Sequence, residues 1–575
     1  MRSAYPRLLL ALAFSGVAGS AGQALAAPPD AAPPDAVPPN SAPERESSEP
    51  QPTDLAAQTD EGSTADRFFT VDYSGYLRWR NDLFYRGDLG AGVGGIRTPL
   101  ENSDLNQGVA DSSDVLAGSN LRFRFAPTIR VAQMFRIKTV IDVLDNLVLG
   151  STPDYHPDRA DVPITALADG QAAVGDGIAV KQLWLEWEFF HGFVLSAGRM
   201  PDGFGLGMVT SSGDGLDSDF GDSTDRFSVL FRAFGFHSLW YFDSPFEGAT
   251  SLSRIDGYGQ AHDLSSVDDA IRWGFTIGMR PLDSNEEAQA QRDLKAGKPV
   301  LQFALKNSFT TQEFESVAID DDELCTEGSA GYAYDCVRLL PREASLWVPD
   351  LWARLDWRPR HDLDIRIEIE LAGIVGDFAY VQNRDDIDSA KDILGMGGVL
   401  QTEIRHGRLT YSLEFGGASG DDVAFGPHGQ GFTSADDAAY AQDARLVNNR
   451  TITRFLFSRD YRVDLILYRE ILGAVTDSFY VKPTVAARLL DTEELRVGGS
   501  LSVLYAQAFL AEPTPGHDNP LGVETDLNLY IEQGKHLRVD LDAGILFPLS
   551  GLDNATTSRS AKTAVTVQAR LGIIF

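Results

Sequence analysis

Residues 362–373 read DLDIRIEIELAG, a stretch in which apolar and charged side chains alternate. The apolar positions are Leu363, Ile365, Ile367, Ile369 and Leu371. Successive side chains of a β-strand point to opposite faces, whereas a helix would scatter both sets around its circumference. The stretch therefore predicts a strand with one apolar and one charged face. A strand of a water-soluble sandwich would look the same, so the rest of the chain must distinguish the two.

The same alternation recurs from residue 68 to the end of the chain, as in 71–80 and 537–547. Connections between these segments alternate between short turns, such as 406–408, and long polar stretches, such as 310–346 and 418–478. One further connection, around 282–298, is predicted to form a short charged helix. This asymmetry is typical of bacterial outer-membrane barrels, which have short periplasmic turns and long extracellular loops. We therefore expect residues 67–575 to form an all-β, transmembrane antiparallel β-barrel of about 18 strands (about 16 to 20).

Composition excludes several other classes of protein. The chain has 49 Lys and Arg against 83 Asp and Glu, a formal net charge of −34, so it would repel nucleic acid. Beyond the first 30 residues no apolar run approaches the roughly 18 residues of a spanning helix. The sequence also lacks G-x-S-x-G and H-E-x-x-H motifs, and we expect no enzymatic activity.

The N-terminal residues are expected to direct export. Arg2 and Arg7 precede the apolar stretch 8–14, and Ala-Leu-Ala at 24–26 resembles a cleavage site, so 1–26 is predicted to be a signal peptide. Residues 27–66 are rich in Pro, Ala and acidic residues and cannot bury a core. They are expected to be a disordered periplasmic tether, with peptidoglycan contact as the alternative.

The C-terminal segment AVTVQARLGIIF ends in Phe575. A final strand that ends in phenylalanine resembles the signal recognised by the barrel-assembly machinery, which is therefore an expected partner. The other expected partners are lipid and lipopolysaccharide in the outer membrane of a Gram-negative bacterium. The sequence leaves open whether the barrel forms a homo-oligomer.

Cys325 and Cys336 are the two cysteines of the chain, and both lie in a polar, Gly-rich segment. In an oxidising compartment this pattern favours a loop disulfide. A metal-binding pair is the alternative, although no histidine lies nearby.

Charged residues of the alternating segments are expected to face the barrel interior, where rings of charge set ion selectivity. Pairing across strands, which would merely fill the barrel, is the alternative. The residues predicted to line the interior are Arg78, Arg80, Arg122, Arg124, Arg136, Lys138, Arg272, Arg354, Arg366, Glu368, Glu370, Arg488 and Arg538.

Two long connections carry distinctive local patterns. The Gly-rich segment 211–226 contains Asp214, Asp217, Asp219, Asp222 and Asp225, and hard carboxylates beside flexible glycines suit Ca²⁺. The alternatives are a solvated loop and a loop folded inward, whose aspartates meet interior arginines. In the second connection, DYRVDLILYREILG (460–473) is unusually apolar and is predicted to form a plug or cap, with an element of a strand pair as the alternative.

Several stretches resemble an uncharacterised family of probable outer-membrane proteins from myxobacteria and relatives. They are GRMPDGFGLGM (198–208), SSGDGLDSDFGDSTDRFSVLF (211–231), SGYLRWRNDLFYRGDLG (74–90), LGVETDLNLYIEQ (521–533) and ILFPL (545–549). The closing block is also loosely similar to alginate-export barrels. Neither resemblance implies catalytic residues. The leading functional hypothesis is a porin-like channel for passive passage of small hydrophilic or charged solutes. The first alternative is a structural or adhesive surface barrel with a plugged interior, and an outer-membrane enzyme is a third, less favoured hypothesis.

Overall fold

The computed structural model describes residues 69–91, 115–132, 134–149, 178–190, 192–233, 235–244, 269–282, 284–318, 337–379, 390–421, 451–555 and 557–575. The predicted signal peptide, the predicted tether and the predicted disulfide between Cys325 and Cys336 lie outside these residues. They stay predictions.

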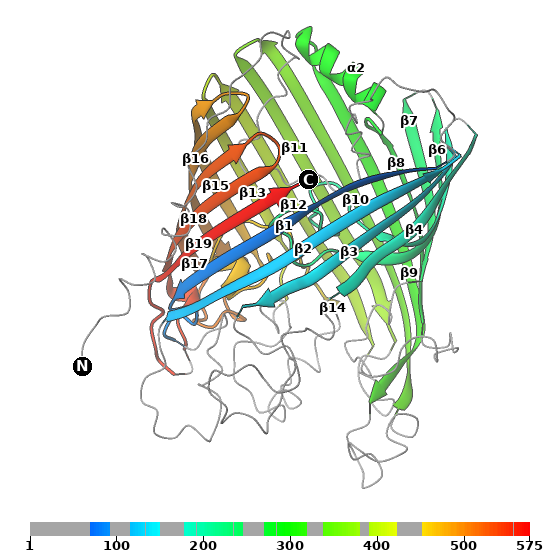
Figure 1. Ribbon diagram of the computed structural model, residues 1–575. Helices are drawn as coiled ribbons and strands as arrows, with labels where there is room; N and C mark the ends of the chain where they lie inside the picture. Colours follow the sequence, from blue (N-terminus) through cyan, green and yellow to red (C-terminus); the bar gives the residue numbers. More distant parts are fainter. Residues whose placement is uncertain are drawn as a thin grey trace, which may run out of the picture. The chain divides into compact units, whose positions relative to one another are not determined.

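The described strands form a closed antiparallel barrel (Figure 1). Each strand of the wall pairs with its neighbours in the chain, and β19 pairs back to β1. Nineteen strands belong to the sheet, but the two-residue β14 pairs in parallel with β12 while β13 pairs directly with β15, so eighteen form the wall. The strands are β1 (Phe69–Tyr85), β2 (Val115–Val131), β3 (Phe135–Val148), β4 (Ile178–Phe190), β5 (Phe193–Pro201), β6 (Ser223–Ala233), β7 (Phe236–Ser244), β8 (Ala270–Met279), β9 (Val300–Ala318), β10 (Val337–Arg360), β11 (Leu363–Phe378), β12 (Lys391–His406), β13 (Leu409–Ala418), β14 (Thr451–Ile452), β15 (Ser478–Asp491), β16 (Leu495–Ala508), β17 (Pro520–Gln533), β18 (Leu537–Pro548) and β19 (Ala564–Ile574).

The predicted alternation of short and long connections is confirmed. Two residues separate β12 from β13, and three separate β17 from β18. Gly407 and Gly534 occupy these turns at φ of 61° and 58°, where an added Cβ would meet no atom within 4 Å. Glycine therefore serves these turns through its backbone freedom rather than through lack of space.

The predicted short charged helix is also present, as α2 (Ser284–Lys295) between β8 and β9 (Figure 1). Among the described residues, no helix has the length and apolar character required to cross a membrane.

One boundary prediction is wrong. Residues 310–346 were expected to form a loop, but β9 continues to Ala318 and β10 begins at Val337. The hydrogen-bonded ladder continues past an aromatic stack through polar residues, where Thr311 pairs with Ser345 and Ala318 pairs with Val337. Trp273 stacks on Phe309 at 4.4 Å between ring centroids, and Phe309 lies 6.2 Å from Trp347. Cross-strand aromatic pairs of this kind stabilise a sheet.

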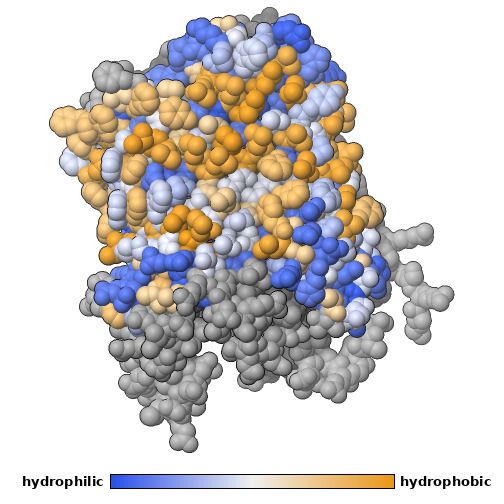
Figure 2. Space-filling model, turned by 180° about the vertical axis from the view of Figure 1, so that it is seen from behind, coloured by the Kyte–Doolittle hydropathy of each residue, from blue (hydrophilic) through white to orange (hydrophobic). Residues whose placement is uncertain are grey.

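The outer face of the barrel is apolar. Trp240, Phe242 and Trp273 are about half exposed on it, and Figure 2 shows apolar side chains covering most of the middle of one outer face, with hydrophilic side chains above and below. A closed sheet with such a band has no unpaired edge and can lie in hydrocarbon. The barrel therefore spans the outer membrane of a Gram-negative bacterium.

The seam of the barrel lies at the C-terminal residue. The backbone of Phe575 exchanges two hydrogen bonds with Gly75, at 2.9 and 3.0 Å, and its ring stacks on Phe123 at 5.8 Å. A Cβ on Gly75 would lie 2.2 Å from the carbonyl oxygen of Arg124 and 2.9 Å from that ring, so only glycine fits between them. Recognition of Phe575 by the assembly machinery stays a prediction.

Two connections enter the barrel, and we call them the inner loop (202–222, between β5 and β6) and the plug segment (453–477, between β14 and β15). The plug segment contains a π-helical turn, η4 (Leu467–Ile471). Its side chains Phe457 and Leu467 are fully buried in one apolar cluster with Phe204 of the inner loop and Leu504 of the wall. The prediction that 460–473 forms a plug is therefore confirmed.

Candidate functional site

Four arginines of β1 and β2 lie on the inner face of the wall opposite the inner loop. Arg78 and Arg122 are cross-strand partners, which brings two cations side by side. Like charges in such positions repel one another. The arrangement therefore requires carboxylates close by.

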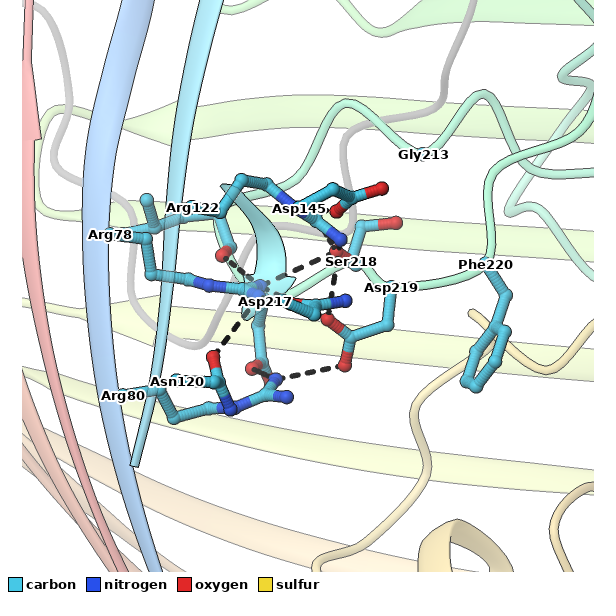
Figure 3. Close-up of polar contacts among 12 residues, drawn as sticks. Arg78, Arg80, Asn120, Arg122, Asp145, Gly213, Asp217, Ser218, Asp219 and Phe220 are labelled. Carbon is cyan, nitrogen blue, oxygen red and sulfur yellow. Dashed lines mark hydrogen bonds and ion pairs between the residues drawn. The ribbon is translucent and has the colours of Figure 1, made fainter. Parts of the chain in front are cut away.

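The first of these carboxylates is Asp219 of the inner loop (Figure 3). It lies 3.1 Å from Arg78, 2.8 Å from Arg80 and 3.0 Å from Arg462 of the plug segment. Burial alone would raise the pKa of Asp219, but Arg80 and Arg78 hold that pKa well below its usual range. Asp219 is therefore a fixed negative charge between the wall and the plug segment.

Asp217, two residues earlier, makes a second junction of the same kind. Its carboxylate lies 2.6 Å from Arg570 of β19, 2.7 Å from Arg469 of the plug segment and 3.2 Å from Arg80. Burial raises its pKa, yet Arg469 and Arg570 outweigh burial and leave the pKa well below its usual value. Two aspartates thus join three parts of the molecule.

The same wall arginines also hold the backbone of the inner loop. Arg122 donates to the carbonyl oxygen of Ser218, and Arg124 donates to that of Gly213, each at 2.6 Å. Arg122 also pairs with Asp145 at 2.6 Å (Figure 3). Hydrogen bonds that involve a charged group are about twice as strong as neutral ones. The conformation of the inner loop is therefore fixed by contacts to main chain as well as to side chains.

The inner loop and the plug segment contact each other directly. Asp460 of the plug segment accepts hydrogen bonds from the backbone N–H groups of Asp219 and Phe220, at 3.0 and 2.9 Å. The guanidinium of Arg459 lies 4.7 Å from the centre of the Phe220 ring. Together with the ion pairs to Arg462 and Arg469, these contacts make the two inward segments one interlocked body.

Buried carboxylates of the wall hold the main chain of both inward segments. Glu524 of β17 accepts N–H groups from Leu465, Ile466 and Leu467 at 3.0, 2.7 and 2.8 Å, at the start of η4. Glu370 of β11 accepts the N–H of Leu206 in the inner loop. A carboxylate that receives several N–H donors is a strong anchor for a chain segment.

The other predicted interior residues also lie in polar contacts. Every arginine or lysine in that predicted set has an ion-pair partner among the described residues, which corresponds to the pairing alternative. The additional pairs are Arg124 with Asp142, Arg136 and Lys138 with Glu186, Arg272 with Asp202, Arg354 and Arg366 with Asp356, Arg488 with Asp491, and Arg538 with Glu532 and Asp540. Glu368 accepts a hydrogen bond from the indole of Trp352 at 2.7 Å.

The five aspartates predicted as a Ca²⁺ site are distributed over different contacts. Asp214 accepts from Ser212, Asp222 accepts from the N–H of Ser211, and Asp217 and Asp219 contact arginines. Asp225 lies on β6 and pairs with Arg199 at 2.7 Å. Within the described ranges, no group of three or more His, Cys, Asp or Glu side chains has metal-binding geometry. Calcium binding at this loop stays a prediction, and the contacts match the inward-folded alternative.

The sequence did not identify Asp460, Arg462 and Arg469 as members of the site. A signal was present, because these charges interrupt an otherwise apolar stretch and a buried charge needs a partner. Their partners could not be named, since Asp217 and Arg469 are 252 residues apart in the chain.

No family model and no curated protein matches the chain, so the resemblance to the myxobacterial family has no support from these searches. Solved structures align with most of it. OccAB3 of Acinetobacter baumannii is 10% identical over 88% of this chain and 99% of that chain, with a TM-score of 0.45. The outer membrane protein OprD of Pseudomonas aeruginosa is 9% identical over 89% and 96%, with a TM-score of 0.43. The chain itself is an outer-membrane β-barrel of eighteen wall strands with two segments folded into its interior.

Proposed function

We propose that the barrel is a porin-like channel for passive passage of small hydrophilic or charged solutes. The inner loop and the plug segment narrow its interior and set its selectivity. A barrel of about 18 strands is wide enough to leave an aqueous interior unless other segments fill it.

The observation that supports this proposal is the solvent exposure of charged side chains on the inner face of the wall. Near the short-turn end, the side chains of Arg354, Arg366 and Asp364 are 23%, 32% and 30% exposed although they are paired. On β1 and β2 the pair Asp72–Arg130 is still more exposed. Hydrated charges on an inner face are what an aqueous vestibule requires.

The test is single-channel conductance of the refolded barrel in a planar bilayer, with reversal potential measured in a salt gradient. We expect small discrete openings, because the interlocked inward segments occupy part of the cross-section. Folding of the barrel can be checked by its heat-modifiable migration in gel electrophoresis. A preparation that is folded by this criterion and shows no conductance at any voltage would contradict the proposal.

A structural or surface barrel with a closed interior is the second candidate. The observation that favours it is the apolar packing of Phe457 and Tyr468, which are almost fully buried between the plug segment and the wall. Deleting residues 455–475 distinguishes the candidates. A channel would conduct before the deletion, with small openings, and its conductance would increase after it. A closed structural barrel would conduct only after the deletion.

A further inference from the structure

A pair of carboxylates lies beneath the first part of the inner loop, away from the arginine junctions. Asp350 of β10 and Glu370 of β11 are 2% and 0% exposed. The strand register pairs Trp352 with Glu370 and Asp350 with Ala372, so the two acids occupy diagonal positions on the inner face. Such positions are about 7 Å apart, and the two carboxylates lie within electrostatic reach of each other.

Three of the four carboxylate oxygens have no hydrogen-bond partner among the described residues. They are both oxygens of Asp350 and Oε1 of Glu370, and each is inaccessible to solvent. A buried charge without a partner carries a large desolvation cost. The pair therefore needs either a proton or a cation.

The positively charged side chains nearby are already engaged. Lys306 is the cross-strand partner of Asp350, but its ammonium lies 2.7 Å from Asp202 and donates to Thr210 at 3.2 Å. Arg354, on the same strand as Asp350, pairs with Asp356 at 2.7 Å. This part of the wall is thus short of positive charge.

The inner loop covers the pair with main chain rather than with side chains. Gly205 has φ of +58°, and a Cβ there would lie 2.4 Å from Oε2 of Glu370. Leu206 donates its N–H to the same carboxylate. The glycine turn is pressed against Glu370, so main chain lies next to the pair, and carboxylate and backbone oxygens are the ligands that hard cations prefer.

We propose that Asp350 and Glu370 bind a hard cation of the Ca²⁺ class, which fixes the first part of the inner loop to the wall. Since no cluster of three metal-ligating side chains occurs in the described ranges, backbone carbonyls and water complete the coordination. Two carboxylates give modest affinity, with a dissociation constant on the order of 10⁻⁴ to 10⁻³ M. This site is separate from the aspartates at 214–225, and it does not depend on conduction through the barrel.

Terbium luminescence provides the direct test, because Tb³⁺ replaces Ca²⁺ and is sensitised by a nearby indole. Trp352 is fully enclosed and is the cross-strand partner of Glu370. Full-length protein, refolded without lipopolysaccharide, is expected to show saturable Tb³⁺ emission that Ca²⁺ displaces. Asp350→Asn and Glu370→Gln should each lower the affinity at least tenfold. Asp72→Asn, which removes an exposed carboxylate on β1, should leave it unchanged.

Thermal unfolding adds a second readout, because the effect of Asp350→Asn on the unfolding temperature should differ between EDTA and Ca²⁺. In EDTA, Asp350→Asn should unfold at a higher temperature than the wild type, because a buried unpaired charge has been removed. In millimolar Ca²⁺ the wild type should gain stability and the variant should not. Equal Ca²⁺ responses of wild type and both variants would overturn the proposal. So would a wild type that ignores Ca²⁺ and is stabilised only by acid, since the pair would then hold a proton.

Discussion

Replacing Glu524 with Gln should loosen the plug segment without changing the shape of the wall. The carboxylate is fully buried and accepts the backbone N–H groups of Leu465, Ile466 and Leu467. Oε1 receives the first two and Oε2 receives the third. A glutamine has one acceptor oxygen, so at least one N–H would face an amide NH₂ group instead of an oxygen.

The magnitude follows from these three contacts. A hydrogen bond to a charged group contributes about 1.5–3 kcal/mol, and a neutral one about 1 kcal/mol. Near the lower end of these ranges, losing one charged bond and weakening two others costs about 3 kcal/mol. Since each 1.4 kcal/mol is a factor of ten, the equilibrium for release of the plug segment should shift by roughly 100-fold.

Limited trypsin digestion measures that release, because the plug segment contains the cleavage sites Arg462 and Arg469, whose side chains are ion-paired and only 19% and 5% exposed when it is seated. When opening and closing are fast, the cleavage rate follows the open population. We expect cleavage at these two sites to be roughly 100-fold faster in Glu524→Gln. Glu493→Gln, in the exposed turn after β15, is the matched control. Unchanged cleavage in a correctly folded Glu524→Gln barrel would refute the view that this carboxylate anchors the plug segment.

Three other changes give distinct outcomes. The double variant Asp217→Asn with Asp219→Asn removes two negative charges from the arginine junctions, and at about 8 Å in water these contribute about 1 kcal/mol. The reversal potential should report a roughly fivefold shift toward anions, and no shift would mean that ions pass elsewhere. Burial raises the pKa of Asp477 to about 7, against about 4 in an unfolded chain. Its contribution to stability is therefore full below about pH 4 and is lost as the pH rises through about 7, and Asp477→Asn should remove that part of the pH dependence of urea unfolding. Gly205→Ala should cost about 2 kcal/mol in the same assay, because it combines a left-handed backbone with a Cβ 2.4 Å from a wall carboxylate. Gly235→Ala has a similar φ of 78° with no atom within 4 Å, so it isolates the backbone part, and an equal loss in both would contradict the steric argument.

The wall was predictable from the sequence because its pattern is local. In 362–373 each side chain differs from its neighbour, and the alternation alone assigns the two faces of β11. The positions of the short turns were predictable for the same reason, because the two or three polar residues that reverse the chain at 407 and 534 are adjacent in the sequence. The limits of β9 and β10 were not predictable, because their ladder continues through polar residues such as Thr311 and Gln312, where the apolar alternation has stopped.

The site was predictable only in its parts. Arg78 and Asp219 were both singled out from the sequence, yet nothing local states that the loop carrying Asp219 folds inward onto the strand carrying Arg78. That choice depends on the energy of the whole arrangement, which includes Asp460 from a third region of the chain. The number of ways to pair charged residues grows quickly with their number, and alternation along the chain does not distinguish among them.

The two inward segments are held by different forces, and this difference determines which segment detaches from the wall first. The acidic part of the inner loop is attached mainly through Asp217 and Asp219, whose ion pairs weaken as salt rises, although burial limits the screening. The plug segment shares these ion pairs through Arg462 and Arg469, but it is also attached through Glu524 and through apolar side chains such as Phe457, whose burial does not weaken with added salt. Concentrated salt should therefore loosen the acidic part of the inner loop while the plug segment stays seated. A narrow passage would then widen at the arginine junctions before the barrel loses its apolar core.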